Sequence, residues 1–266
     1  MKRLLALTLT LVLALTCTAV FATAEELTAT VTVTVSKSGS LVLAAETVTV
    51  TDADGDGVLT VSDALYAAHE AGYDGGAAAG YEAYLHKDYG LSLGKLWGDT
   101  SGNFGYYLDN ASAWSLADPV ADGSYVCAFV YADGKSYSDV YTFFDQTLVS
   151  GKVGEEITLT LSKAGYDADW NPVVLPVEGA VITVNGQPTT VKTDITGKAT
   201  LTLTEEGDVL ISAVCQGMTM VPPVCKAKTT SGVQAGDPGA ALLLLPGILG
   251  YTGVLCMTRL RKKLDN

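Results

Sequence analysis

Oxygen-bearing side chains recur at alternate positions in one short stretch of this sequence, Asp52-Ala53-Asp54-Gly55-Asp56-Gly57-Val58-Leu59-Thr60-Val61-Ser62-Asp63. In loop order, the donors would be Asp52, Asp54, Asp56, the Val58 backbone carbonyl, Thr60 and Asp63, at positions 1, 3, 5, 7, 9 and 12. Ca²⁺ requires six to eight hard oxygen ligands around one point. Gly57 at position 6 permits the sharp reversal that such a loop needs. The spacing therefore predicts a Ca²⁺ site.

A second interpretation of the same residues needs no metal. Asp side chains close turns by accepting backbone N–H groups, and Gly tolerates positive φ, so Asp–Gly clusters are also ordinary turn chemistry. Position 12 is Asp63 rather than a longer Glu, which predicts weak binding, with a dissociation constant of about 10⁻⁴–10⁻³ M. We therefore expect a structural clip suited to a calcium-rich exterior.

The stretch resembles an EF-hand calcium loop that leads into a helix, and it resembles one half of a dockerin. Dockerins carry two such repeats, whereas this sequence has one Asp-x-Asp-x-Asp-Gly motif. The dockerin resemblance therefore implies calcium binding, without implying cellulosome docking.

Both ends of the chain have the composition of targeting segments. A basic start, an apolar run and a small-x-small site predict a signal peptide over residues 1–24. Residues 239–258 carry no charge and precede a basic tail over 259–266, which predicts a transmembrane helix with a cytoplasmic tail. A buried core helix is the alternative for 239–258. We expect a type I single-pass protein of the cell membrane, exposed outside a Gram-positive bacterium.

Between these segments the chain is acidic. Residues 25–238 hold 28 acidic and 10 basic residues, a net charge of −18. This charge excludes nucleic acid and anionic lipid as expected partners and favours divalent cations. Cys127, Cys215 and Cys225 remain in this region, an odd number that allows at most one disulfide. The ten-residue separation of Cys215 and Cys225 predicts that these two are bridged.

The hydrophobic pattern of residues 25–146 predicts an α+β domain. We expect strands over 28–35 and 41–51, a helix from Ser62 or Asp63 to about Ala71, a short helix over 81–88, and strands over 91–97, 104–108 and 125–131. Two strands, a helix and then further strands is the order of a β-grasp, so the predicted fold is β-grasp-like.

Three segments of this domain resemble the C-terminal domains of transcobalamin-type proteins. They are the strand-to-helix segment 57–65, the strand and Asn turn over 105–110, and the closing turn and aromatic strand marked by 122–124 and 129–131. In that family such a domain can cover a corrinoid that a helical partner domain holds. The resemblance implies a β-grasp fold and a corrinoid-type ligand.

Residues 147–228 change to short alternating strands joined by tight turns. Strands are expected over 157–161, 180–184, 189–193, 199–203 and 209–215, and Asn185-Gly186 predicts a type I′ hairpin. The segments 179–184 and 193–199 resemble bacterial Ig-like domains, which implies an all-β sandwich of about seven strands. We expect a hinge near 146–151 and a linker over 229–238.

No arrangement of residues with convincing spacing predicts catalysis. The two histidines, His69 and His86, are expected to be solvated, and they could form a metal pair only if their two predicted helices met. Six aromatic residues are candidates either for a ring- or carbohydrate-binding face or for core and cross-strand pairs: Tyr81, Tyr84, Trp97, Tyr106, Tyr107 and Trp114.

Two functional hypotheses follow. The first is a non-enzymatic, membrane-anchored surface binding or adhesion module with a structural calcium site. The second is an envelope component that captures a corrinoid- or haem-like small molecule. An extracellular protein, a glycan or a small molecule could each be the ligand, and an exposed, concave aromatic face would favour the second hypothesis.

Overall fold

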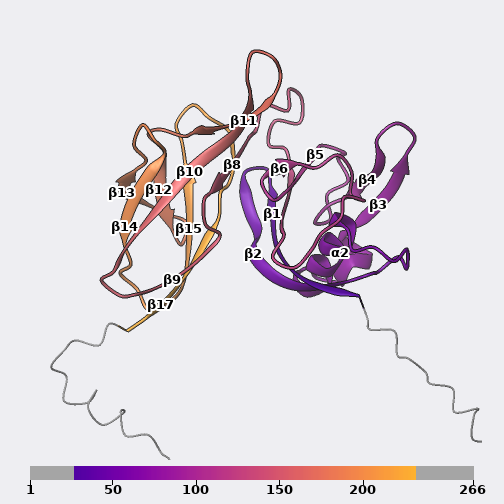
Figure 1. Ribbon diagram of the computed structural model, residues 1–266, viewed down its shortest axis with the longest axis horizontal. Helices are drawn as coiled ribbons and strands as arrows, with labels where there is room; N and C mark the ends of the chain where they lie inside the picture. The colour runs from indigo at the N-terminus through magenta and orange to yellow at the C-terminus, as the bar shows by residue number, and fades with distance from the viewer. Residues whose placement is uncertain (1–26, 232–266) are drawn as a thin grey trace, which may run out of the picture.

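The computed structural model of the protein describes residues 27–231, which form two mostly β units lying side by side (Figure 1). The expected signal peptide over 1–24, the membrane helix over 239–258 and the basic tail over 259–266 lie outside these residues. Within the described part of the chain, no helix has both the length and the apolar character needed to cross a membrane.

The first unit contains seven strands and two helices. They are β1 (Thr28–Lys37), β2 (Ser40–Thr51), α2 (Val61–Gly72), α3 (Gly76–Gly80), β3 (Glu82–His86), β4 (Gly90–Lys95), β5 (Phe104–Leu108), β6 (Ala111–Ser112) and β7 (Tyr125–Val130). Five strands form a mixed sheet in the order β2-β1-β7-β5-β6, in which β1 and β7 are parallel. The expected order of two strands, a helix and further strands is confirmed.

Alternation along β1 and β2 explains why α2 covers one face of this sheet. Val31, Val33 and Val50 point to one side and are fully buried. The buried side of α2, which includes Ala64 and Leu65, packs against the same cluster. Period-2 strands and a period-3.6 helix thus present their apolar sides to one core.

The expected short helix over 81–88 is wrong. Glu82–His86 is strand β3, which pairs antiparallel with β4 in a separate two-stranded sheet. Ala, Leu and Glu are strong helix formers, but helix propensities differ by less than about 1 kcal/mol per residue, so cross-strand pairing with Gly90–Lys95 overrides their preference. Gly90, at a φ of +72°, follows the turn that reverses the chain.

The second unit contains ten strands, where about seven were expected. They are β8 (Val140–Phe144), β9 (Leu148–Lys152), β10 (Glu156–Tyr166), β11 (Pro172–Pro176), β12 (Val181–Val184), β13 (Gln187–Lys192), β14 (Lys198–Thr202), β15 (Gly207–Val214), β16 (Met220–Val221) and β17 (Cys225–Thr230).

Two sheets of the second unit enclose one core. One has the order β11-β10-β8-β16, with β14 also paired to β10, and the other has the order β13-β12-β15-β17-β9. Leu159, Leu161, Ile182 and Ile211 are fully buried within it. An all-β sandwich was expected here. Both residues of the predicted Asn185-Gly186 turn have positive φ, 50° and 78°, as a type I′ turn requires.

Strand β8 precedes the expected boundary at residue 146 but pairs with strands of the second unit. Its neighbours are β10 on one side and β16 on the other. The expected hinge over 146–151 contains the start of β9, which pairs in parallel with β17. The chain passes between the two units through residues 131–139, upstream of the expected division.

The second face of the first unit's sheet packs against the second unit. Along β7, Val126, Ala128 and Val130 point towards α2, whereas Cys127 and Phe129 point the opposite way. The latter join Tyr107 of β5 in a cluster with Tyr141, Phe143, Ala164 and Val221 of the second unit. The rings of Tyr107 and Tyr141 stack with centroids 3.6 Å apart and planes 8° apart. Both faces of this sheet are therefore covered.

Candidate metal centre and adjacent groove

The aspartate-rich loop connects the end of β2 to the start of α2. Its turns require positive φ at Gly55 (78°) and Gly57 (87°), which other residues adopt only at an energetic cost. Asp52 Oδ1 accepts N–H bonds from Gly55 (2.7 Å) and Asp56 (3.1 Å), and its Oδ2 accepts one from Gly57 (2.7 Å). These bonds, led by the one from Gly57, lower the pKa of Asp52 and keep it ionised.

Asp63 connects the loop to the helix. Its Oδ2 accepts bonds from the backbone N–H (2.9 Å) and hydroxyl (2.7 Å) of Thr60, and its Oδ1 accepts one from Ala53 N–H (3.0 Å). Thr60, rather than the expected Ser62 or Asp63, is the N-cap, and Asp63 is the third helical residue of a capping box. The Asp63 side chain is thereby fixed in a buried position.

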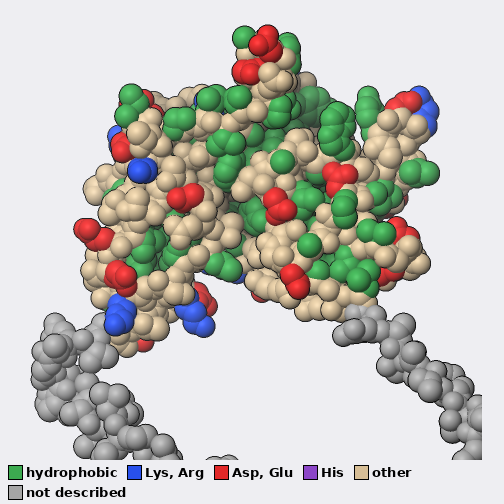
Figure 2. Space-filling view, in the orientation of Figure 1, with side chains coloured by type: hydrophobic (Ala, Val, Ile, Leu, Met, Phe, Trp, Pro, Cys, Tyr) green, Lys and Arg blue, Asp and Glu red, His purple; other side chains and the backbone are tan. Residues whose placement is uncertain are grey.

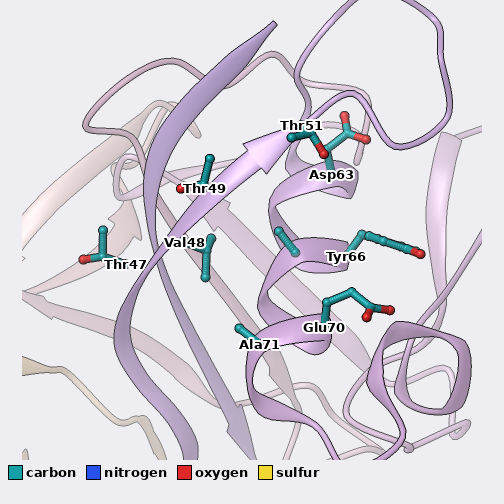
Figure 3. Close-up of a pocket in the computed structure, with 9 residues that line it drawn as sticks. Thr47, Val48, Thr49, Thr51, Asp63, Tyr66, Glu70 and Ala71 are labelled. Carbon is teal, nitrogen blue, oxygen red and sulfur yellow. The ribbon is translucent and has the colours of Figure 1, made fainter. Parts of the chain in front are cut away.

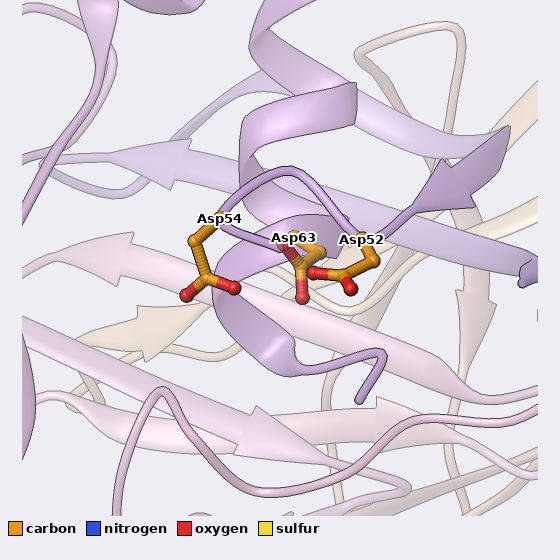
Figure 4. Close-up of side chains that lie close together, drawn as sticks. All are labelled: Asp52, Asp54 and Asp63. Atoms are coloured by element: carbon orange, nitrogen blue, oxygen red, sulfur yellow. The ribbon is translucent and has the colours of Figure 1, made fainter. Parts of the chain in front are cut away.

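Three carboxylates gather on one side of the loop. One oxygen from each of Asp52, Asp54 and Asp63 lies within 4.8 Å of the other two (Figure 4). Ca²⁺–O distances are 2.3–2.6 Å, so oxygens on opposite sides of one ion are about 5 Å apart. Asp63 Oδ1 accepts one N–H and keeps a second lone pair for an ion. The donor set therefore fits Ca²⁺.

The electrostatics of the loop favour a cation. Desolvation is the main cause that raises the pKa of Asp54, and the negative charges of Asp56 and Asp63 raise it further. The hydrogen bond from the Asp56 N–H lowers this pKa but does not cancel the rise. Three clustered carboxylates repel one another, and a divalent ion between them removes that repulsion.

Of the other three predicted ligands, Asp56 lies outside this group of carboxylates. Asp56 Oδ1 accepts an N–H bond from Val58 at 2.8 Å, which is the turn chemistry of the alternative interpretation. The Thr60 hydroxyl is bonded to Asp63 in the helix cap, and the Val58 backbone carbonyl stays a predicted ligand. The structure thus combines the two interpretations, because the same loop holds clustered carboxylates and side chain-to-backbone turns.

His69 is buried rather than solvated. Its Nδ1 lies 2.6 Å from the Leu65 carbonyl, and its Nε2 accepts the Trp97 backbone N–H at 3.0 Å. This arrangement requires a neutral ring with the proton on Nδ1. His86 lies on β3 and stacks on Tyr89, with ring centroids 4.7 Å apart, so the two histidines do not meet as a metal pair across two helices.

A groove of about 470 Å³ lies beside the carboxylate cluster, between β2 and α2 (Figure 3). The strand contributes Thr47, Val48, Thr49 and Thr51, and the helix contributes Asp63, Tyr66, Ala67, Glu70 and Ala71. Nothing in the sequence analysis identified this groove, because it depends on α2 lying over an edge strand. Two features of the sequence could have indicated the groove. Thr and Val alternate after Glu46, and the helix that follows has alanines four residues apart.

The six candidate aromatic residues divide into three groups. Tyr81, Trp97 and Tyr106 pack against the core of the first unit, and Tyr107 lies in the contact with the second unit. Tyr84 and Trp114 are exposed, the latter by 91%. Further exposed side chains lie on two projecting hairpins and were not predicted from the sequence. Tyr166 ends β10 and Trp170 lies in the turn before β11, whereas Leu85 lies on β3 and Tyr89 lies in the turn before β4. Apolar side chains on these projections are visible in Figure 2.

The predicted Cys215–Cys225 disulfide is wrong, because all three described cysteines are free. Cys225 on β17 lies opposite Ile211 of β15, four residues before Cys215. At about 3.3 Å per residue, this offset separates the two cysteines by about 13 Å along the strand direction, well beyond the reach of a disulfide.

No family model and no curated protein matches this chain. Among solved structures, the D0-D1 domain of intimin aligns with 76% of this chain and 96% of its own length, at 16% identity and a TM-score of 0.27. Sidekick-1 immunoglobulin domains 1–4 align at 14% identity and a TM-score of 0.22, over 77% of this chain and 52% of their own length. The chain spans 23% of the N-terminal four Ig domains of Dscam1 isoform 9.44, at 8% identity over 41% of this chain and a TM-score of 0.22.

Proposed function

We propose that this protein is a non-enzymatic binding or adhesion module of the cell surface, in which a β-grasp-like unit and an Ig-like sandwich form one binding body. The observation that carries this proposal is the location of the exposed aromatic side chains. Trp114, Trp170 and Tyr89 are 91%, 80% and 70% exposed, and all lie on loops or hairpins outside the two cores. Large exposed aromatic rings are a common means of contact with proteins and sugars.

The covered sheet supports this proposal over capture of a corrinoid- or haem-like molecule. A planar ring system needs an open aromatic face, but Tyr107 and Phe129 on the β-grasp-like sheet pack against Tyr141 and Phe143. Ligand contact is therefore left to loops and edges. Signal peptide 1–24 and the apolar segment 239–258 would place this body outside the membrane.

A binding assay with the purified full chain tests the proposal. We expect retention on peptidoglycan or on insoluble neutral polysaccharide, and we expect Trp170→Ala or Trp114→Ala to reduce retention at least fivefold. Ile195→Ala is the matched control, because Ile195 is also exposed (72%) but lies on another turn. Absence of retention on every polymer and on extracellular matrix proteins would contradict the proposed function.

Calcium is the structural cofactor in this proposal, with Asp52, Asp54 and Asp63 as side-chain ligands and backbone carbonyls or water completing the shell. The ion would fix the end of β2 to the start of α2, because its ligands come from both sides of the loop.

Thermal unfolding of the full chain tests the metal site. An ion that binds only the folded state, present at about ten times its dissociation constant, should stabilise the fold by about 1.4 kcal/mol and raise the melting temperature by about 3–6 °C. Asp54→Asn should reduce this increase, since it removes one ligand charge and keeps an oxygen for the Asp56 N–H. Asp122→Asn, outside the loop, is the control. Equal melting temperatures in Ca²⁺ and in chelator would exclude the site.

A further inference from the structure

The outer edge of β2 is open along its C-terminal half. Within residues 27–231, β2 ends its sheet and pairs only with β1. Edge strands usually carry Lys, Pro or a bulge that prevents pairing with another chain. From Glu46 to Thr51 the sequence is Glu-Thr-Val-Thr-Val-Thr, with no Lys or Pro, and the strand's irregularity lies before it, at Ala45 (φ 41°). This half-strand is suited to accept another strand.

Helix α2 gives this open edge a binding groove. The helix packs mainly over β2 rather than over the middle of the sheet, so the groove follows the strand edge (Figure 3). Ala67 and Ala71 are the small side chains on its helical side, and Tyr66 is 41% exposed beside them. A strand edge beside a helix with small residues accommodates the backbone of an added strand and its alternate side chains.

The charge of the groove selects among possible occupants. Its lining includes Asp63 and Glu70 and no basic residue, and the aspartate-rich loop lies at one end. An antiparallel second copy of β2 would bring two such acidic grooves together, and like charges disfavour that contact. A basic strand would gain attraction instead.

We propose that the β2–α2 groove binds an extended peptide with basic residues, which adds to the sheet as a strand beside Thr47–Thr51. Its apolar side chains would lie over Ala67 and Ala71. Its flanking Lys or Arg residues would approach Glu70, whose Oε1 also accepts the Ala77 N–H, and the aspartate-rich loop, whose four aspartates keep a net negative charge when one Ca²⁺ is bound. This inference rests on the proposed binding function and adds the class of one partner.

Fluorescence anisotropy with the purified full chain tests the groove. The probe is a fluorescein-labelled heptapeptide, Lys-Thr-Val-Thr-Val-Thr-Lys, and saturable binding is expected. Ala71→Arg should weaken binding at least tenfold, because it fills the groove and repels the lysines. Ala78→Arg on α3 adds the same charge at another exposed alanine and should leave binding unchanged. Matching far-UV spectra and melting temperatures establish that both variants fold.

Three modified peptides separate strand addition from charge attraction alone. In a strand, the N–H groups of successive residues point to opposite edges, so the valine N–H groups point to one edge and the threonine N–H groups to the other. N-methylation of the valines and N-methylation of the threonines should therefore weaken binding to extents that differ at least tenfold. Replacing both lysines by Glu should also abolish binding. The inference would be overturned by any of three results. The peptide does not bind saturably, the two methylation patterns weaken binding equally, or the chain forms a dimer that Ala71→Arg dissociates. The polymer assay with the Trp variants is independent, so these outcomes leave the proposed function standing.

Discussion

His69 connects α2 to the segment after β4 through both ring nitrogens. Nδ1–H donates to the Leu65 carbonyl, and Nε2 accepts from Trp97 N–H, while Tyr73, Tyr81 and Trp97 surround the ring. A proton on Nε2 would oppose the Trp97 N–H and place a charge in a desolvated site. Burial accordingly lowers the pKa of His69 below 6.5, despite the opposite effect of the Leu65 carbonyl.

This bonding predicts a loss of stability in mild acid. The unfolded chain binds the proton near pH 6.5, whereas the folded chain binds it only at lower pH, so stability is full above 6.5 and falls as pH decreases towards the folded pKa. For this one proton, the free energy of unfolding falls by up to about 1.4 kcal/mol for each pH unit. Urea unfolding between pH 7.5 and 5.5 measures it. His69→Gln should flatten the slope, whereas His86→Gln should not, and an unchanged slope in His69→Gln would refute the assignment.

The residues of the aspartate-rich loop show how far residue types can be interpreted from sequence. Asp52, Asp54 and Asp63 were predicted as ligands from spacing alone, and they are the three that lie together. Thr60 was predicted as a ligand for the same reason; it is the helix N-cap, and its role as a ligand stays a prediction. A hydroxyl two or three residues before an acid fits both patterns, and only the fold of the loop separates them.

At the scale of elements, the N-terminus of α2 is held by more than its capping box. The backbone N–H of Val61 donates to the Asp118 carbonyl (3.0 Å), and that of Ser62 donates to the Leu116 carbonyl (2.8 Å). These two bonds satisfy N–H groups that an α-helix leaves without internal partners. The cap therefore fixes the start of the helix, and one wall of the groove, without any ion.

Thr60→Val is expected to cost about 1–2 kcal/mol of unfolding free energy, the range for a lost N-cap. It removes the hydroxyl bonded to Asp63 and leaves the side-chain volume nearly unchanged. Denaturant unfolding in chelator measures this cost, because the cap needs no metal. Thr49→Val, at an exposed strand position, should change stability by less than about 0.5 kcal/mol. If Thr60→Val were harmful only in Ca²⁺, Thr60 would be a metal ligand instead.

Periodic segments were predictable from sequence, whereas elements that depend on distant partners were not. Strand β5 matches its expected bounds, 104–108, and β1 and α2 differ from theirs by about two residues. Strand β3 was expected to be helical because its pairing with β4 is not visible in its own composition. Similarly, β8 was assigned to the first unit, since its neighbours β10 and β16 follow it by up to about eighty residues.

At the scale of the whole molecule, the two units share an apolar contact that the sequence analysis did not foresee. Strand β7, the run Tyr125–Val130, is buried on both faces, a pattern typical of a strand between two layers. Cys127 is fully buried in this contact, and that burial raises its pKa to about 12. A Lys226–Glu46 ion pair (2.8 Å) adds a second, more exposed link between the units.

The last prediction concerns this contact. Tyr141 is 3% exposed, stacks on Tyr107 and donates a hydrogen bond to Asn110 Oδ1 at 2.8 Å. Both Tyr107 and Asn110 belong to the first unit, so Tyr141 holds the units together through its ring and its hydroxyl. The native chain should unfold in one calorimetric transition, because each unit covers an apolar face of the other.

Tyr141→Ala should cost about 3–5 kcal/mol and separate that transition into two, since it removes the central ring of the contact. Tyr141→Phe should cost only about 1 kcal/mol and keep one transition, because the ring stays and one hydrogen bond is lost. Tyr166→Ala, at a tyrosine that is 59% exposed, is the matched control and should unfold like the native chain. A single, unshifted transition in Tyr141→Ala would mean that the units do not stabilise one another. Two transitions in the native chain would also mean that the units do not stabilise one another. The contact around Tyr107 and Phe129 would then be too weak to keep ligands from that face of the sheet.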